Sequence, residues 1–184
     1  MHSPARPPVR PEDEPVAVFD AGGAVIGVAP RGEVYRDGIW HGATGVLLRS
    51  GDGERVYAHR RTPEKLIWPG RFDCWAGGVI GPGESPDAAA VRELAEELGV
   101  GPGDGVPLTP IERFAFEGDG VRCHMFTYEA RWDGPVRHQP EEIAWGGWVT
   151  LDELRGWLDD PEGHPFVPDG RVGIERWFSA RRAR

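Results

Sequence analysis

Short apolar runs alternate with turns rich in Gly and Asp along most of the chain. The runs contain many Val, Ile, Phe and Trp residues, which is typical of β-strands, and the turns between paired runs favour hairpins. The pattern therefore predicts three hairpins and one further strand. The predicted strands are 16–19 with 24–28, 43–49 with 55–60, 111–117 with 121–130, and 143–150 on its own.

One segment between these runs has the spacing and the end signals of an α-helix. Ser85 is a good N-cap, Pro86 suits the first helical position and Gly99 suits a left-handed stop. The sequence thus predicts a helix over residues 86–98. Apolar residues recur within it at i, i+3, i+4 and i+7, and we expect this stripe to be the core face. The stripe consists of Val91, Leu94, Ala95 and Leu98.

Two more helices are predicted near the end of the chain. Thr150 and Glu153 fit a capping box that opens a helix to about Leu158. Residues 170–180 fit a last helix, and the arginines that follow suit the negative end of a helix. A mixture of hairpins with few helices favours an α+β fold.

Length and charge limit the number of domains and the classes of partner. A chain of 184 residues is long enough for one domain with its own core. We expect that domain at residues 15–184, after a flexible tail at residues 1–14 that is rich in Pro, Arg, Glu and Asp. The 30 acidic residues outnumber the 21 basic ones, and the net charge of −9 repels nucleic acid and anionic membranes. We therefore expect neither as a partner.

The cysteines and the hydropathy indicate the compartment. Cys74 and Cys123 have no metal-ligand spacing and are interpreted as buried thiols. Apolar stretches stay well below the ~20 residues of a spanning helix, and the first residues lack the apolar middle of a signal peptide. These features predict a cytoplasmic protein.

Three glutamates in the predicted helix 86–98 are candidate metal ligands. At about 100° per residue, Glu93, Glu96 and Glu97 are expected to project opposite the core face and to converge at one point. Crowded carboxylates repel one another without a cation, and hard oxygen ligands favour Mg²⁺ or Mn²⁺. The alternative is a solvated acidic face, in which Arg92 pairs with Glu96. The glycine-rich loop at residues 77–84 favours the metal site, because an ordinary surface helix needs no such lead-in.

The segment from residue 78 to residue 100 resembles the Nudix box, with its Gly, Glu and Arg residues at fixed separations. The resemblance implies an α/β/α sandwich with a mixed sheet and a catalytic loop and helix. It also implies divalent-metal ligands, namely Glu93, Glu96, Glu97 and the Gly78 carbonyl. Glu84 and Arg92 are then a supporting pair that fixes the loop to the helix.

The reaction implied by this family is attack of water on one phosphorus of a diphosphate, and a base must take the proton of that water. Glu97 and Glu93 are candidates, but a metal-bound carboxylate is a weak base. Many Nudix proteins supply an acid from a later loop before a Trp-containing strand. Glu142 has that place, six residues before Trp148, with Glu141 as the alternative. Both could equally be ordinary loop charges.

A second resemblance covers residues 60–85 and concerns the isopentenyl-diphosphate isomerases and their hydrolase-like relatives. It rests on Arg60-Arg61, Lys65, Trp68-Pro69-Gly70 and Gly83-Glu84-Ser85. It implies that Arg61 and Lys65 bind the substrate diphosphate. The alternative for Lys65 is a solvated loop cation.

The positions that an isomerase needs for its chemistry are changed in this chain. Gly77 stands in place of the catalytic cysteine, and Val79 and Val34 stand in place of two metal-binding histidines. Only His41 matches, and a lone histidine before an apolar strand is more often structural than a ligand. The intact glutamates therefore favour hydrolysis over isomerisation, and a Nudix-type module that binds a nucleotide without turnover is the other alternative.

The identity of the substrate is left open by the sequence. A small-molecule diphosphate that is nucleotide-derived is expected, and a nucleotide, a nucleotide sugar and a prenyl diphosphate are all compatible. Trp40, Trp68, Trp75 and Trp145 lie in or near predicted loops, where each could stack on a base or pack against the core. Whether the chain acts as a monomer or as a homodimer is also open.

Overall fold

The structure is a computed structural model, and it describes residues 10–182. Of the tail expected at residues 1–14, the first nine residues lie outside the described residues. The rest of it has structure: Pro11–Asp13 forms a short 3-10 turn (η1), and Glu14 forms an ion pair with Arg31 across 2.8 Å. Residues 10–14 thus have defined structure before the first strand.

The described strands and helices agree closely with the sequence pattern. All seven predicted strands are confirmed within a few residues, and so are the three predicted helices. The strands are β1 (Pro15–Phe19), β2 (Val25–Pro30), β3 (His41–Arg49), β4 (Arg55–Arg61), β5 (Phe72–Asp73), β6 (Trp75–Ala76), β7 (Thr109–Gly118), β8 (Val121–Arg131) and β9 (Ile143–Thr150). The helices are α1 (Arg31–Arg36), α2 (Pro86–Leu98), α3 (Leu151–Asp159) and α4 (Pro168–Arg182), with a second 3-10 turn, η2 (Pro102–Asp104).

The sequence pattern missed the shortest elements. Helix α1 has six residues, and β5 and β6 have two each. Segments of this length carry too few apolar positions to show a period. The second predicted hairpin is also different from expectation, because β3 and β4 share only the pair Arg49 and Val56 before they diverge into separate ladders.

Strand β3 is the centre of the mixed sheet. All nine of its residues are buried. It runs parallel to β8 over its whole length and antiparallel to β1 and β6. Strand β8 continues antiparallel to β7, while β4 pairs antiparallel with β9 and β5. A fully buried central strand needs cover on both faces, which the helices supply.

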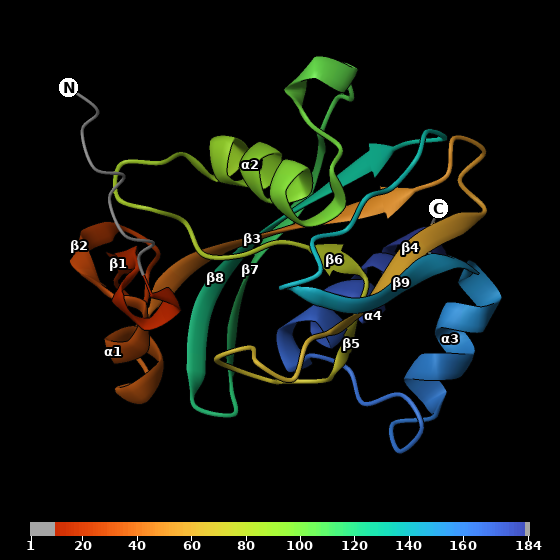
Figure 1. The fold of residues 1–184 in the computed structure, drawn as a ribbon. Helices are drawn as coiled ribbons and strands as arrows, with labels where there is room; N and C mark the ends of the chain where they lie inside the picture. Colours follow the sequence, from red (N-terminus) through yellow and green to blue (C-terminus); the bar gives the residue numbers. More distant parts are fainter. Residues whose placement is uncertain (1–9, 183–184) are drawn as a thin grey trace.

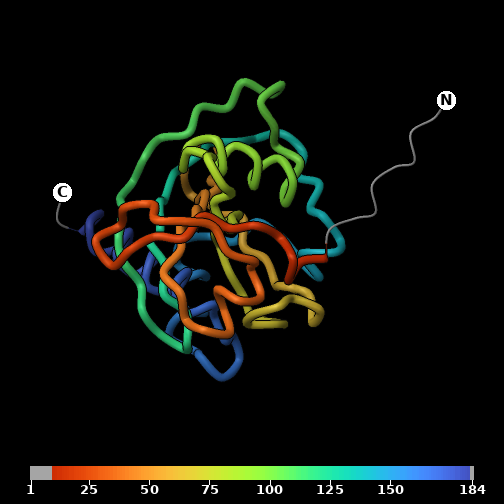
Figure 2. The backbone as a smooth tube through the Cα atoms, turned by 90° about the vertical axis from the view of Figure 1, so that its left-hand side faces the viewer, coloured from red at the N-terminus to blue at the C-terminus, as the bar shows by residue number. Residues whose placement is uncertain are grey.

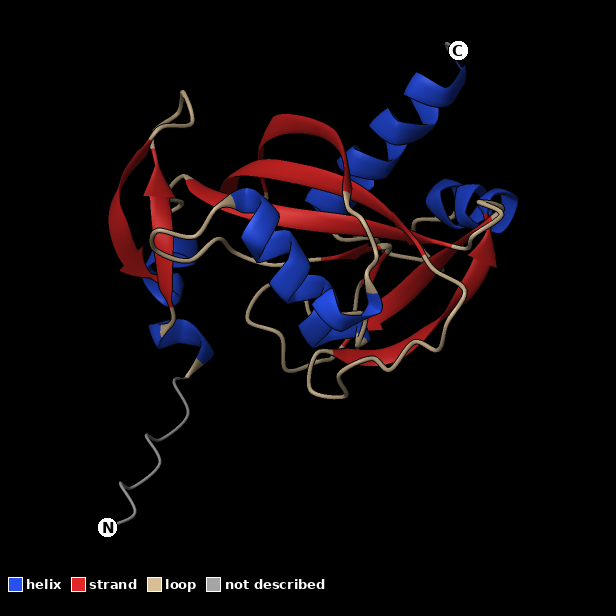
Figure 3. Cartoon of the chain, turned by 90° about the horizontal axis from the view of Figure 1, so that it is seen from above, coloured by secondary structure: helices blue, strands red, loops and turns tan. Residues whose placement is uncertain are grey.

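The helices lie on both sides of the sheet, so the fold is an α/β/α sandwich of the α+β class. Helix α2 covers one face, and α3 and α4 cover the other (Figures 1 and 3). Val46 and Leu48 of β3 pack under Leu94 and Leu98 of α2, whereas Leu47 packs against the opposite layer. The alternation of side chains along β3 thus builds two separate cores.

The first hairpin and the cysteines complete the description. Strands β1 and β2 form a ribbon at one edge of the molecule, in front of the sheet in the rotated view of Figure 2. Cys74 and Cys123 are buried and free, which confirms their interpretation as thiols. Over the described part of the chain, every helix is too short or too polar to span a bilayer.

Candidate active site

Helix α2 begins and ends where its capping residues predict. The Ser85 side chain accepts a hydrogen bond from the backbone N–H of Ala88 at 3.1 Å. At the other end Gly99 has φ of 68°, and its N–H donates to the Ala95 carbonyl. Because both ends are fixed by local contacts, the loop before the helix and the carboxylates on it keep a defined relative position.

The acidic side chains of α2 do not lie opposite the core face, so that prediction was wrong. Glu93 and Glu97 are 9% and 5% exposed, and only Glu96 is exposed to solvent. Seen down the helix, Glu97 and Glu93 lie about 60° and 100° around from Leu94. They flank the core on the side of the small residues Ala89 and Ala90, which are fully buried. We call Glu93, Glu96 and Glu97 the acidic wall.

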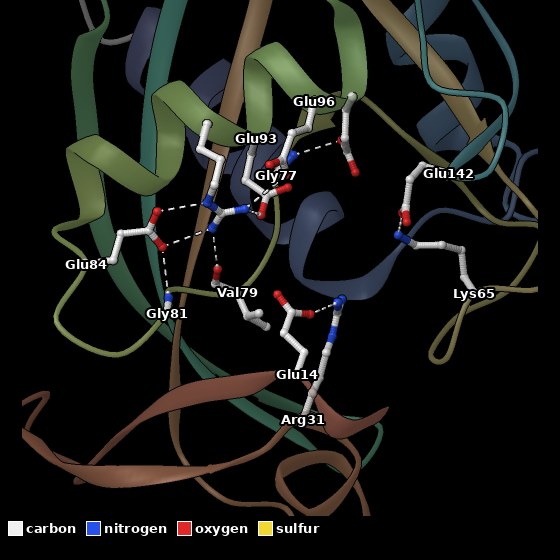
Figure 4. A network of polar contacts seen from close by, with 12 residues as sticks. Glu14, Arg31, Lys65, Gly77, Val79, Gly81, Glu84, Glu93, Glu96 and Glu142 are labelled. Carbon is white, nitrogen blue, oxygen red and sulfur yellow. Dashed lines mark hydrogen bonds and ion pairs between the residues drawn. The ribbon is translucent and has the colours of Figure 1, made fainter. Parts of the chain in front are cut away.

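Arg92 holds the glycine-rich loop against α2. Its Nε and Nη2 donate to the two oxygens of Glu84 at 2.8 and 3.0 Å, and Nη2 also donates to the Val79 carbonyl at 3.1 Å. The backbone N–H of Gly81 donates to the same Glu84 carboxylate at 2.9 Å. A bidentate pair of this kind is a strong and directional contact. It fixes the loop that faces the acidic wall (Figure 4).

Two glycines of this loop allow the backbone to approach the acids closely. A Cβ at Gly78 would lie 2.5 Å from Oε1 of Glu93, so a larger residue there would displace the Glu93 carboxylate. The N–H of Gly77 donates to Oε2 of Glu97 at 3.0 Å. The Gly78 carbonyl accepts a hydrogen bond from the Thr44 N–H at 2.9 Å, which leaves its second lone pair for any further ligand.

The electrostatics of the acidic wall fit a divalent cation. Burial and the neighbouring Glu97 raise the pKa of Glu93 to about 7, and burial raises the pKa of Glu97 as well. Two buried carboxylates one turn apart are stable as anions only with a cation beside them. Their oxygens are hard ligands of the kind that Mg²⁺ and Mn²⁺ prefer. The chemistry of the donor set thus agrees with a metal site.

The acids do not yet converge on one point, however. In the described part of the chain, no three His, Cys, Asp or Glu side chains are arranged as a metal site. The reason is Arg92, whose Nη1 donates to Glu93 at 2.6 Å and to Glu96 at 3.2 Å. A cation at the acidic wall would replace these two contacts.

Basic side chains from other elements face the acidic wall across a cleft of about 350 Å³. Lys65, from the loop after β4, forms an ion pair with Glu142, and Arg31 of α1 forms one with Glu14 (Figure 4). Burial and the nearby Arg61 lower the pKa of Lys65 to about 8. The cleft is lined by Glu14, Arg31, Lys65, Gly77, Gly78, Arg92, Glu93, Glu96, Glu97, Gln139 and Glu142.

Arg61 lies deeper than Lys65 and Arg31. It lines a smaller space, the inner cavity, which shares Arg31, Lys65, Gly77 and Gly78 with the cleft. Arg61 donates from Nη2 to the Ile67 carbonyl at 3.2 Å, whereas its buried Nε has no hydrogen-bond partner among residues 10–182. We call Arg31, Arg61 and Lys65 the cationic wall.

The structure separates the two acids of the later loop. Glu142 points at Lys65 and lines the cleft. Glu141 is exposed and contributes its carbonyl, which accepts a hydrogen bond from the Thr62 hydroxyl at 3.0 Å. Of the two, Glu142 is therefore the residue whose carboxylate lies in the cleft, beside Lys65.

The positions that differ from the isomerases have structural roles here. A Cβ at Gly77 would collide with the Thr44 carbonyl oxygen, so a cysteine cannot occupy this backbone. Val79 and Val34 are buried in one apolar cluster. His41 is buried, its Nδ1 lies 3.2 Å from the Ile39 carbonyl, and burial lowers its pKa to about 4. His41 is thus a neutral structural residue.

The four tryptophans near predicted loops have different surroundings. Trp75 is buried and donates from Nε1 to the Gly170 carbonyl at 2.9 Å. Trp40 packs on His124 with ring centroids 4.9 Å apart. Trp68 lines the inner cavity, whereas Trp145 is 44% exposed and packs near Trp157, away from the cleft. Only Trp68 and Trp75 border the candidate site.

Sequence reasoning missed several residues of this site. Arg31 and Gln139 line the cleft, and Asp73 and Asp169 line the inner cavity. Asp73 carried a weak signal, because it stands inside the apolar run Phe72 to Ala76, where a charged residue is unusual. The other three stand in polar segments that give no such signal.

Comparison with known proteins identifies the family of this chain. The model of the NUDIX domain family matches residues 40–169. The chain is 50% identical to the uncharacterized Nudix hydrolase orf19 of Rhodococcus erythropolis over 94% of this chain and 96% of that protein. It is 42% identical to the uncharacterized Nudix hydrolase SCO1686 of Streptomyces coelicolor over 93% of this chain and 92% of that one.

The fold also has a clear match among solved structures. The crystal structure of DR0079 from Deinococcus radiodurans aligns with a TM-score of 0.75 at 25% sequence identity. The alignment covers 89% of this chain and 98% of DR0079. The similarity of fold thus extends over most of the chain.

Proposed function

The chain belongs to the Nudix hydrolase family, and we propose that it is a pyrophosphohydrolase dependent on Mg²⁺ or Mn²⁺. Its substrate in this proposal is a nucleoside diphosphate linked to another moiety, and the bond that breaks is the phosphoanhydride. Nudix hydrolases generally use divalent metal ions and act on small nucleotide-derived molecules. Our proposal for this chain adds the identity of the metal and the bond that is cleaved.

The observation that supports this proposal most is that the acidic wall and the basic side chains face each other across the cleft. Glu93 and Glu97 are buried on one side of the cleft, while Lys65 and Arg31 stand on the other. A diphosphate needs both kinds of partner, because its oxygens bind basic side chains directly and bind carboxylates only through a cation. An acidic protein with net charge of −9 would otherwise repel such a ligand.

Glu93, Glu96 and Glu97, with the Gly78 carbonyl, are the residues that would hold the metal. A metal bound there neutralises phosphate charge and makes a water molecule more acidic. The protein itself supplies position: the Gly77 N–H orients Glu97, and Arg92 fixes the loop through Glu84. Lys65, Arg61 and Arg31 bind the oxygens of the diphosphate and orient it for in-line attack.

Glu142 is our candidate for the general base. The water oxygen forms a bond to phosphorus while the bridging P–O bond breaks, and the leaving phosphate keeps the electron pair. The proton of the water goes to a carboxylate oxygen of Glu142. Glu142 is now paired with Lys65, so a substrate phosphate that binds Lys65 would release the carboxylate for this task. Glu97 and Glu93 are poorer bases when they hold a cation.

Isomerisation of prenyl diphosphates is poorly supported by the same site. The backbone at Gly77 excludes the cysteine that this chemistry needs, and Val79 is an apolar residue in a sheet contact with Ala43. A module that binds a nucleotide without turnover is also less well supported. Such a module would not need the full set of carboxylates, Glu93, Glu96 and Glu97, that this chain keeps.

The proposal predicts release of a phosphorylated product from nucleoside diphosphate derivatives only when Mg²⁺ or Mn²⁺ is present. Glu97→Gln and Glu96→Gln should each lower kcat by about 10³-fold with an unchanged fold, because charge stabilisation in the transition state is lost. The exposed Glu162, which lies outside the cleft, gives the control Glu162→Gln with parental activity. Turnover that persists in both wall variants would overturn the mechanism, and an inactive parent on a broad panel would favour the binding module.

A further inference from the structure

The inner cavity continues from the cleft into the protein. Lys65, Arg31, Gly77 and Gly78 line both spaces, so a ligand held by the two walls has direct access to it. Its volume is about 70 Å³. Since roughly 10–15 Å³ of such space holds one water molecule, the cavity fits about five waters or one compact group of similar size.

Two carboxyl groups form the floor of the inner cavity. Asp73 of β5 is 7% exposed, and its Oδ1 accepts hydrogen bonds from the N–H groups of Cys74 and Trp75 at 2.7 and 3.2 Å. Its other oxygen, Oδ2, has no hydrogen bond to any residue between 10 and 182. Asp169 lies next to it at the start of α4, where its Oδ1 accepts from the Gly170 N–H at 2.8 Å.

The neighbourhood of these carboxyls is tightly built. A Cβ at Gly170 would lie 2.5 Å from Oδ1 of Asp73, so the carboxyl packs directly on the helix backbone beside Asp169. The isolated bridge between Phe72 and Phe166 brings the two segments together. Burial and the charge of Asp169 raise the pKa of Asp73 to about 8. A protonated Asp73 can donate as well as accept hydrogen bonds.

Arg61, a basic residue of the inner cavity, also lacks a full set of polar partners. No ion pair within 4.0 Å joins Arg61 to an acidic residue in the described chain, and its buried Nε has no partner. Buried polar groups are costly unless they are hydrogen-bonded, so unused donors and acceptors around one cavity indicate a ligand. A hydroxyl group can both donate to a carboxylate and accept from a guanidinium.

Other ligand classes fit this space less well. Apolar side chains, among them Ile67, Trp68 and Met125, also line the cavity, but a prenyl chain there would bury apolar carbon against two carboxyls and a guanidinium as well. An ammonium group would meet the three basic side chains Arg31, Arg61 and Lys65, which outnumber the two carboxyls. A nucleoside is too large for about 70 Å³. A compact group with several hydroxyls matches both the volume of the cavity and its unpaired hydrogen-bond donors and acceptors.

We propose that the inner cavity is the subsite for the second moiety of the substrate, and that this moiety is a compact polyhydroxylated group, a sugar or a short polyol. Asp73 and Asp169 accept hydrogen bonds from its hydroxyls, and Arg61 donates to them. This inference rests on the proposed function only in that it places the diphosphate between the acidic and cationic walls.

The test measures binding separately from turnover. We would titrate the Glu142→Gln protein, which turns over slowly but keeps the acidic wall, in Mg²⁺ by calorimetry with UDP-glucose, UDP-galactose, ADP-ribose and CDP-glycerol, each against its parent UDP, ADP or CDP. At least one hydroxylated ligand should bind about tenfold more tightly than its parent. Isopentenyl diphosphate should gain nothing over inorganic pyrophosphate.

Asp73→Asn and Asp169→Asn then locate the subsite. Both variants keep the oxygen that accepts from the backbone, so each retains that structural contact. Each should remove about tenfold of the affinity for the favoured ligand and leave that of its parent diphosphate within about twofold. Asp104→Asn, in the exposed turn η2, is the matched control and should change neither.

The outcomes distinguish this inference from the proposed function. If the wild type cleaves nucleoside diphosphates but no hydroxylated ligand binds more tightly than its parent, the subsite is overturned and hydrolysis stands. Equal losses for ligand and parent in both Asp variants would overturn it too. If nothing is cleaved but the selective loss is seen, the subsite stands and the hydrolase mechanism fails.

Discussion

The two walls of the cleft are built in different ways. The acidic wall comes from residues 93–97 of a single helix, and its neighbours Arg92 and Gly77 hold it through hydrogen bonds of 2.6 to 3.2 Å. The cationic wall comes from α1 and from β4 with the loop after it, so Arg31 is well separated in the sequence from Arg61 and Lys65. The comparison shows that one half of the site is encoded locally and the other half depends on the tertiary fold.

The partners of the two walls differ as well. The acids are held by backbone N–H groups and by an arginine that also holds the loop. Lys65 and Arg31 are each paired with a single carboxylate, Glu142 and Glu14, which a phosphate can replace. We therefore expect changes in the glutamates of the acidic wall to affect the chemical step at an unchanged fold, and changes in the cationic wall to affect binding.

The largest effect within the cleft, after loss of the acidic wall itself, is expected at Glu142, the acid that is paired with Lys65. Glu142→Gln should lower kcat by about 10²-fold, since a general base contributes about that much or more. KM should change little, because the amide can still accept from Lys65. Glu141→Gln is the matched control, since its side chain is exposed and outside the cleft. Equal activity of the two variants would show that the base lies elsewhere.

A smaller effect is expected on the cationic side. Lys65→Ala and Arg61→Ala should each raise KM by about tenfold with a smaller change in kcat, because a charged hydrogen bond to the diphosphate is lost. Arg60→Ala is the control, since Arg60 is exposed on the same strand and donates to the Gly70 carbonyl instead. Steady-state kinetics with one nucleoside diphosphate derivative suffice. Unaltered KM in both variants would remove these residues from the binding site.

The smallest effect concerns the stability of the acidic wall's support. Arg92→Ala should lower the free energy of unfolding by about 2 kcal/mol, because the bidentate contact with Glu84 and the contact with the buried Glu93 are both lost. Arg122→Ala removes only an exposed pair with Glu117 and should cost about 0.5 kcal/mol or less. Urea unfolding of both variants measures the difference. Similar losses would mean that the loop is held by other contacts.

The acidic half of the site could be predicted because its signals are local. The cap at Ser85, the stop at Gly99 and the spacing of the glutamates fixed the helix and its candidate ligands. The predicted direction of the glutamate side chains was wrong because the core face of the helix had been assigned from its larger apolar residues alone. The sheet packs against Leu94 and Leu98, as the stripe predicts, but also against Ala89 and Ala90, whose small side chains let the helix approach closely.

The cationic half could be predicted only in part. Arg61 and Lys65 were suggested by resemblance, but Arg31 depends on a six-residue helix that carries no periodic signal. Asp73 and Asp169 meet only because β5 lies beside the segment before α4, as the hydrogen bond from the Val167 N–H to the Phe72 carbonyl shows. Contacts across such sequence separations follow from topology, which no local pattern contains.

The central claim is that the acidic wall binds a divalent cation opposite the cationic wall. Titration of Mn²⁺ followed by electron paramagnetic resonance, with a nucleoside diphosphate present, tests it most directly. The account predicts saturable binding to the wild type and to Glu162→Gln, and binding at least about tenfold weaker to Glu97→Gln. Equal Mn²⁺ affinity in all three proteins, or no saturable binding at all, would contradict it.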